Sequence, residues 1–235
     1  MRASLARRTG AEFLGTALLV AAVIGSGIMG ERLAGGNTAI ALLANTIATG
    51  AALVALILAL GPISGAHFNP VVTVTDAMEG GIPWREAPTY MCSQVLGGVA
   101  GAAAANLMFG LPIVSISQRA RSGGAQLLSE FIATFGLLSV IWGCSRLRSN
   151  ASAFAVGAYI TAAYWFTAST SFANPAVTIA RTLSDTFAGI RPHDMPGFIA
   201  AQVAGGAAAT FLFRWMVPAL PSAAKDVVVP RKQET

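Results

Sequence analysis

The sequence predicts an all-α membrane protein with six transmembrane helices and two re-entrant half-helices, arranged as an inverted repeat. Hydrophobic residues make up 54% of the chain and charged residues 11%, whereas soluble domains carry about a quarter charged residues. The charges lie mainly in short connectors between apolar runs of about 20 residues, the length that crosses a bilayer. Three short fragments also recur, in the same order, in the two halves of the chain.

Six apolar segments are predicted to span the membrane. Their expected ranges are Ala11–Met29, Asn37–Leu60, Pro88–Phe109, Gln126–Cys144, Ala151–Phe166 and Gly197–Val217. Two further segments, 61–80 and 169–187, are less hydrophobic and rich in Gly, Pro, Asn and Thr. Non-helical backbone is tolerated at membrane depth only where it is buried in protein or lines a wet cavity. These two segments are therefore predicted to enter the bilayer without crossing it.

The distribution of basic residues predicts the orientation. No cleavage-site pattern follows the first apolar run, so the basic start MRASLARR is interpreted as a cytoplasmic flank of a retained helix. With six spans both termini are then cytoplasmic, and ten of the 15 Lys and Arg residues fall on that side, as the positive-inside rule expects. The net charge of +5 follows from this topology and implies no nucleic-acid partner. No metal-ligand spacing or cofactor motif is recognised, so neither is expected.

The repeat is carried by three pairs of fragments. These are AEFLGTALLV at 11–20 with SEFIATFGLL at 129–138, QVLGG from Gln94 with QVAGG from Gln202, and NPVVT at 69–73 with NPAVT at 174–178. Three spans per half is an odd number, so the second copy enters the membrane upside down relative to the first. The prediction is one membrane domain over 1–235, with repeats of about 9–110 and 126–218 and a basic tail at 219–235.

The two Asn-Pro pairs predict where the half-helices start. Asn is a favoured N-cap and Pro is favoured at the first helical position, so Asn69-Pro70 and Asn174-Pro175 each begin a helix after an irregular loop. Inverted symmetry brings the two helix starts face to face near the midplane, each with roughly half a positive charge. The loop carbonyls then line a cavity, into which the Asn amides donate.

Several polar side chains within the predicted spans have two interpretations. Glu12 and Glu130 occupy symmetric positions, which favours buried acceptors for the backbone of the two loops over a proton relay. Gln94 and Gln202 are interpreted as structural partners of the same loops. His67 precedes Asn69 by two residues, and lining of the cavity is favoured over simple packing.

These motifs resemble the major intrinsic protein family, the aquaporins and glycerol facilitators. SGAHFNPVVT at 64–73 is similar to the first pore loop of that family, and AEFLGT and SEFIAT are similar to the openings of its first and fourth helices. The resemblance extends from Ala11 to about Trp215. It implies the aquaporin fold, a homotetramer with one pore per subunit, and a location in the inner (plasma) membrane of a bacterium.

The chain departs from the family pattern at two positions of its Asn-Pro motifs. The second motif is Asn174-Pro175-Ala176, but the first continues with Val71, which is expected to repack the contact between the half-helices. The family continues its second motif with an arginine of the selectivity filter, where this chain has Val177. Counting from each Asn, the resemblance implies a filter formed by Thr49, Ala162, Ser171 and Val177, with Phe172 in place of Ser171 if the alignment slips by one residue.

A filter of short side chains predicts a wide pore. An arginine narrows a pore and repels cations, and valine does neither, so solutes larger than water are expected to pass. Arg181 lies one helical turn beyond Val177, where two interpretations stand: a positive charge in the vestibule, or an ion pair with Asp185.

The predicted function is passive conduction of small uncharged solutes, and no enzyme activity is expected. Glycerol, urea, water and arsenite are the expected solutes, and methylated arsenicals also fit a wide filter. Arsenicals are included because the filter without arginine resembles a bacterial branch of the family associated with arsenic resistance. The alternative is a secondary transporter, since inverted repeats and broken helices also occur in that class.

Overall fold

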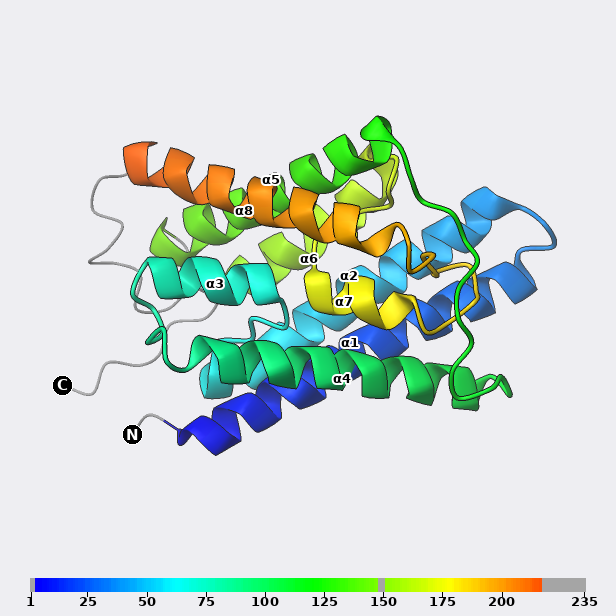
Figure 1. The fold of residues 1–235 in the computed structure, drawn as a ribbon, viewed down its shortest axis with the longest axis horizontal. Coiled ribbons are helices and arrows are strands. Elements are labelled where there is room, and N and C mark those ends of the chain that lie inside the picture. Colours follow the sequence, from blue (N-terminus) through cyan, green and yellow to red (C-terminus); the bar gives the residue numbers. More distant parts are fainter. Residues whose placement is uncertain (1–2, 148–150, 217–235) are drawn as a thin grey trace.

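The computed structural model describes residues 3–147 and 151–216, and within them the fold is entirely α-helical (Figure 1). The helices are α1 (Leu5–Leu33), α2 (Thr38–Ser64), α3 (Pro70–Met78), α4 (Ala87–Met108), α5 (Gly124–Leu147), α6 (Ser152–Phe166), α7 (Pro175–Arg181) and α8 (Met195–Met216). The basic tail predicted at 219–235 lies outside the described residues.

The helices confirm the predicted fold class of six spans and two half-helices. Five of them, α1, α2, α4, α5 and α8, are long and apolar enough to cross a membrane. The sixth predicted span is α6, whose 15 described residues are fewer than those of the other five. The two short helices, α3 and α7, begin directly at Pro70 and Pro175, as the Asn-Pro pairs predict.

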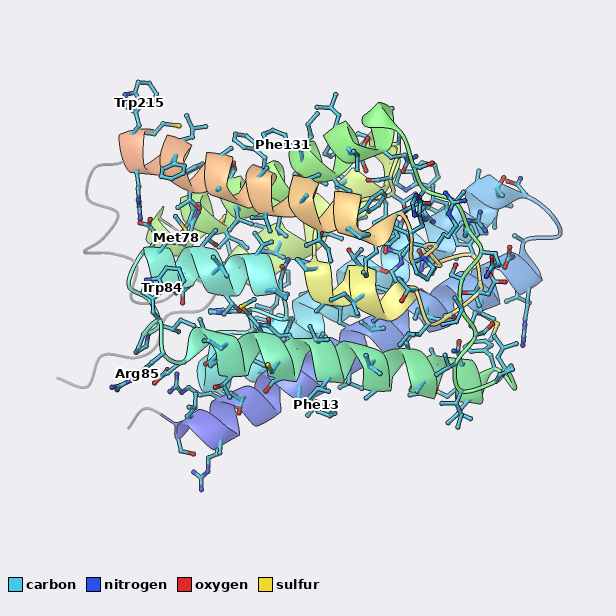
Figure 2. The ribbon with its side chains drawn as sticks, viewed as in Figure 1. Phe13, Met78, Trp84, Arg85, Phe131 and Trp215 are labelled. Carbon is cyan, nitrogen blue, oxygen red and sulfur yellow. The ribbon has the colours of Figure 1, made fainter. Side chains whose placement is uncertain are left out.

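Close helix contacts hold each half together. Helix α1 packs on α4 and α2, and α5 packs on α8 and α6. A Cβ at Gly97 of α4 would lie 2.3 Å from the carbonyl oxygen of Phe13, and a Cβ at Gly205 of α8 would lie 2.3 Å from that of Phe131. Figure 2 shows both phenylalanine side chains at the outer edge of the bundle. Glycine is therefore needed at both places, because any side chain would push the paired helices apart.

One end of the molecule carries exposed tryptophans beside basic residues. Trp84 and Trp215 are 58% and 79% exposed, and Figure 2 shows both of them, with Arg85, at the end where α1 begins and α8 ends. Tryptophan is enriched where a membrane meets water, so this end lies at one membrane surface. The opposite end, beyond the loop that joins α1 to α2, is called the outer end below.

The two half-helices approach each other from opposite ends. Figure 1 shows α3 on the side where α1 begins and α7 toward the outer end, with their first residues near the middle of the bundle. The loops that precede them, 65–69 and 167–174, reach the same central region. This arrangement places both Asn-Pro pairs at the centre of the molecule.

Candidate functional site

Each asparagine caps its own half-helix. The Asn69 side-chain oxygen accepts a hydrogen bond from the Val71 N–H at 3.0 Å. That of Asn174 accepts from the N–H groups of Ala176 at 2.9 Å and Val177 at 3.3 Å. The caps fix the first turns of α3 and α7, whose unpaired N–H groups give the central region a positive potential.

The same two asparagines also bind the loops to each other. The Asn69 amide donates to the carbonyl of Ala173 at 2.7 Å, and the Asn174 amide donates to the carbonyl of Phe68 at 2.7 Å. A side-chain amide has two N–H donors, so each asparagine keeps one for another acceptor. Both asparagines line a cavity through the centre of the molecule.

Glu12 holds the first loop in an unusual backbone conformation. Ala66 and Phe68 have φ angles of 51° and 50°, which L-residues seldom adopt. The Glu12 carboxylate accepts hydrogen bonds from the N–H groups of His67 at 3.0 Å and Phe68 at 2.7 Å. It also accepts from the Gln94 amide at 2.8 Å. These contacts favour the interpretation of Glu12 as a buried acceptor for the loop.

Glu130 does the same for the second loop. Its carboxylate accepts from the N–H groups of Phe172 and Ala173, both at 2.9 Å, and from the Gln202 amide at 2.6 Å. Ser171 and Ala173 have φ angles of 51° and 48°. These three charge-assisted hydrogen bonds offset the cost of this backbone conformation and of the buried charge.

The cavity has one apolar wall and one polar wall. The loops and half-helices supply carbonyl, amide and hydroxyl groups, together with His67, Phe172 and Arg181. The apolar wall comes from α1, α2, α5 and α6, and consists of Leu19, Val23, Leu53, Ile57, Leu137, Ile141, Val156 and Ile160. Such a cavity suits a solute with an apolar side and several polar groups.

Three of the four expected filter residues line this cavity, namely Thr49, Ser171 and Val177. Ala162 does not: it is exposed on the outside of α6, so this expectation was wrong. Successive helical residues are about 100° apart, and Ile160 and Tyr164, two positions to either side, face the cavity instead. The Tyr164 hydroxyl lies 3.2 Å from that of Thr49.

Arg181 lies in the cavity wall. Of its two interpretations, the one that predicted an ion pair with Asp185 is wrong. The Arg181 side chain is only 1% exposed, and its guanidinium carbon lies 3.3 Å from the centre of the Phe172 ring. Its Nε donates to the carbonyl of Ala188. Asp185 accepts instead from the N–H of Gln118 at 2.9 Å. Phe172, expected as a pore-lining candidate and as the replacement for Ser171 if the alignment slips, lines the cavity together with Ser171.

Arg121, in the connector between α4 and α5, was missed by sequence reasoning. Its guanidinium donates to the carbonyls of Gly189 at 2.8 Å and Ser169 at 3.1 Å, which ties three connectors together. Burial lowers the pKa of Arg121 to about 9, with a further contribution from the charges of Arg181 and Arg119. It remains a cation at neutral pH. The sequence signals only a basic residue in a connector.

His67 both lines the cavity and packs within the protein. Its Nδ1 lies 3.1 Å from the hydroxyl of Thr73, and its Nε2 lies 3.3 Å from a carboxylate oxygen of Asp76. The ring also lies 5.4 Å from that of Tyr90. The two interpretations of His67 are therefore not exclusive.

Val71 contacts α8 at a glycine. A Cβ built on Gly206 would lie 2.3 Å from a methyl carbon of Val71. We expect Gly206→Ala to destabilise the protein by about 1–3 kcal/mol, as overpacking of a filled core does. Combination with Val71→Ala should relieve most of this loss. Thermal unfolding in detergent of both single variants and the double variant gives the coupling between the two sites.

Gly143→Ala is the matched control, because its nearest neighbour atom is 3.9 Å away, an ordinary contact. Replacement of a helical glycine by alanine stabilises a helix by up to about 1 kcal/mol. The expectation for Gly206 fails if both alanine variants are equally stable.

Comparisons with known proteins agree with this architecture. The family described as Major intrinsic protein matches residues 1–152. Aquaglyceroporin AqpS of Rhizobium meliloti (strain 1021) is 54% identical over 218 residues, which cover 92% of this chain and 93% of that protein. Aquaporin NIP3-1 of Oryza sativa subsp. japonica is 34% identical over 164 residues, 67% of this chain and 52% of that protein.

A solved structure shares the fold. The X-ray structure of the aquaglyceroporin from Plasmodium falciparum matches with a TM-score of 0.71 at 18% identity, over 92% of this chain and 99% of that one. At this identity the match shows the arrangement of the helices and no more.

Proposed function

Because the chain belongs to the major intrinsic protein family, we propose that it conducts glycerol and similarly small uncharged solutes, such as urea and water, passively through its central cavity. Proteins of this family are integral membrane channels and not enzymes, and this chain is one of them. The observation that carries the choice of solutes is Val177, which lies in the cavity wall one turn inside Arg181. No long side chain narrows the lumen at that position.

The two walls of the cavity suit a polyol. The carbon chain of glycerol packs against the apolar wall that α1, α2, α5 and α6 provide. Its hydroxyl groups face the donors and acceptors of the two loops, which include the remaining N–H groups of Asn69 and Asn174. On entering the cavity the solute gives up its hydrogen bonds to water. The donors and acceptors of the loops replace them, which keeps the barrier to passage low.

Trivalent arsenite belongs to the same class of solutes. As(OH)₃ is neutral and presents three hydroxyl groups, as glycerol does, so the same donors and acceptors fit it. A methylated arsenical replaces a hydroxyl by a methyl group, which the apolar wall and Val177 accommodate. We include both among the proposed solutes.

The alternative of a secondary transporter is less well supported. Coupled transport needs an ion or proton site. The two carboxylates that the predicted spans offer for that role, Glu12 and Glu130, each accept hydrogen bonds from a loop. No observation on the described residues specifically favours coupling, so we retain passive conduction.

The exposed surface supports a proposal for the oligomeric state and the membrane location. Helices α2 and α6 present apolar side chains such as Ile47 and Phe154, exposed by 58% and 57%, which suits contact with lipid or with other copies. We propose a homotetramer in a bacterial inner membrane, with both termini in the cytoplasm, since α1 begins and α8 ends at the same end (Figure 1).

Stopped-flow light scattering on proteoliposomes tests the proposal. Gradients of glycerol, urea and arsenite should each dissipate faster than in protein-free liposomes of the same size, and at the same rate with or without a pH gradient. Permeation of water alone would refute the proposed solutes. Solute accumulation driven by a pH gradient would favour the transporter.

A further inference from the structure

The outer part of the cavity contains a guanidinium group, that of Arg181, with N–H donors that are not used by the protein. Arg181 is 1% exposed and lines the cavity. Its Nε donates to the carbonyl of Ala188, whereas its two terminal nitrogens make no hydrogen bond to any described residue. Among the described residues, no carboxylate forms an ion pair with it. The terminal N–H groups are therefore available to a solute.

A second polar group of the cavity wall, the Ser171 hydroxyl, lacks a hydrogen-bond partner among the described residues. Ser171 is 3% exposed and lines the same cavity as Arg181. It directly precedes Phe172, on whose ring the Arg181 guanidinium lies. A buried polar group that lacks a partner in the protein requires another one, and a solute in the cavity supplies an acceptor.

Positive charge exceeds negative charge around this part of the cavity. Arg121 also lies over the Phe172 ring, with its guanidinium carbon 5.0 Å from the ring centre. Of the nearby carboxylates, Glu130 accepts from neutral loop N–H groups and therefore offsets part of this charge, whereas Asp194 is paired with the Arg191 side chain. A concave site with an excess of one sign of charge concentrates ions of the opposite sign.

Taking the cavity to be the proposed pore, we propose that Arg181 and Ser171 form a subsite for a small monovalent oxyanion, a carboxylate or sulfonate with a short apolar group. A guanidinium binds such a group through two parallel N–H donors, and the Ser171 hydroxyl donates a third hydrogen bond. Val177 and Phe172 face the apolar end of the anion. Because Val177 is short, the guanidinium is reachable from the lumen.

A pair of probes with the same shape and different charge tests the subsite. Methanesulfonate is an anion, and dimethyl sulfone is its neutral counterpart with a methyl group in place of one oxygen. Added outside proteoliposomes, methanesulfonate on the order of ten millimolar should reduce glycerol flux at least about twofold, and the sulfone should leave it unchanged. This comparison of the two probes uses the wild-type protein, so it does not depend on the folding of any variant.

Three variants assign the effect to residues. Arg181→Gln and Ser171→Ala should each weaken inhibition by methanesulfonate, while Arg181→Lys should keep part of it. Arg32→Gln is the matched control: it removes the same charge from a residue that stacks on Phe109 at the outer end and is absent from the cavity wall. Inhibition of that variant should match the wild type, which also cancels general effects of ionic strength.

Two results would overturn the subsite: equal inhibition by both probes, or equal loss of inhibition in the Arg32 and Arg181 variants. Binding is also measured without transport, by the rise in melting temperature of the purified protein with methanesulfonate. If the protein conducts no glycerol, the proposed function fails. The melting experiment then decides the subsite, since stabilisation that Arg181→Gln abolishes supports it and absence of stabilisation refutes it.

Discussion

Replacement of Val177 by arginine is expected to reduce glycerol flux at least about tenfold, which corresponds to an added barrier of about 1.4 kcal/mol. The Val177 side chain lies in the cavity wall and is 5% exposed, so a guanidinium at this position has to extend into the lumen. It would also lie one turn from Arg181 on the same helix, and repulsion between the two cations would turn the new guanidinium away from Arg181. Stopped-flow light scattering measures the effect.

Val177→Met separates length from charge. Methionine is about as long as the aliphatic part of an arginine side chain, but it is flexible and uncharged. It should therefore reduce glycerol flux by a smaller factor than arginine does. Water flux should fall less than glycerol flux in the arginine variant, since water needs less width. Glycerol flux that survives the arginine substitution unchanged would show that Val177 is not at the narrowest point.

Replacement of Glu130 by glutamine is expected to destabilise the protein by about 2–4 kcal/mol. The glutamine NH₂ would replace an oxygen that accepts from the Phe172 or Ala173 N–H, so two donors would face each other in a buried site. The loop at 167–174 would lose the acceptor that holds its left-handed residues. Thermal unfolding in detergent measures the loss.

Glu31→Gln is the control, because Glu31 is exposed at the end of α1 and should change stability by less than about 0.5 kcal/mol. The two variants remove the same charge, so their difference reports the buried hydrogen bonds of Glu130. A Glu130 variant that is as stable as the wild type but does not conduct would contradict the structural role of Glu130. It would favour a direct role of its carboxylate in transport.

Much of the architecture could be predicted from the sequence because it rests on strong local signals. An apolar run of about 20 residues has few alternatives to a membrane span. Asn-Pro after a breaker-rich loop predicts a helix start, and α3 and α7 begin there. Glu12 and Glu130 stood out because carboxylates are costly within spans and because they recur at symmetric places.

The side chains that face the cavity were harder to predict. The direction in which a side chain leaves a helix changes by about 100° for each residue of misalignment. Counting across a loop of unknown length therefore assigned Ala162 to the cavity, although it lies on another face of α6. A tyrosine two residues later, within an otherwise apolar span, was the available signal for Tyr164. No local pattern predicts that Arg121 folds back over the second loop, because its acceptors are carbonyls from distant connectors.

The hydrogen bonds between the two asparagines and the opposite loops also have a consequence for biosynthesis. Asn69 is 104 residues ahead of Ala173, the carbonyl of which it binds. At a translation rate of roughly 5–20 residues per second, the ribosome delivers that acceptor on the order of 5–20 s after the donor. During this interval the first loop has Glu12 but not its partner from the second half. The first half-helix therefore takes its final position only after the second half has entered the membrane, and the pore is completed last.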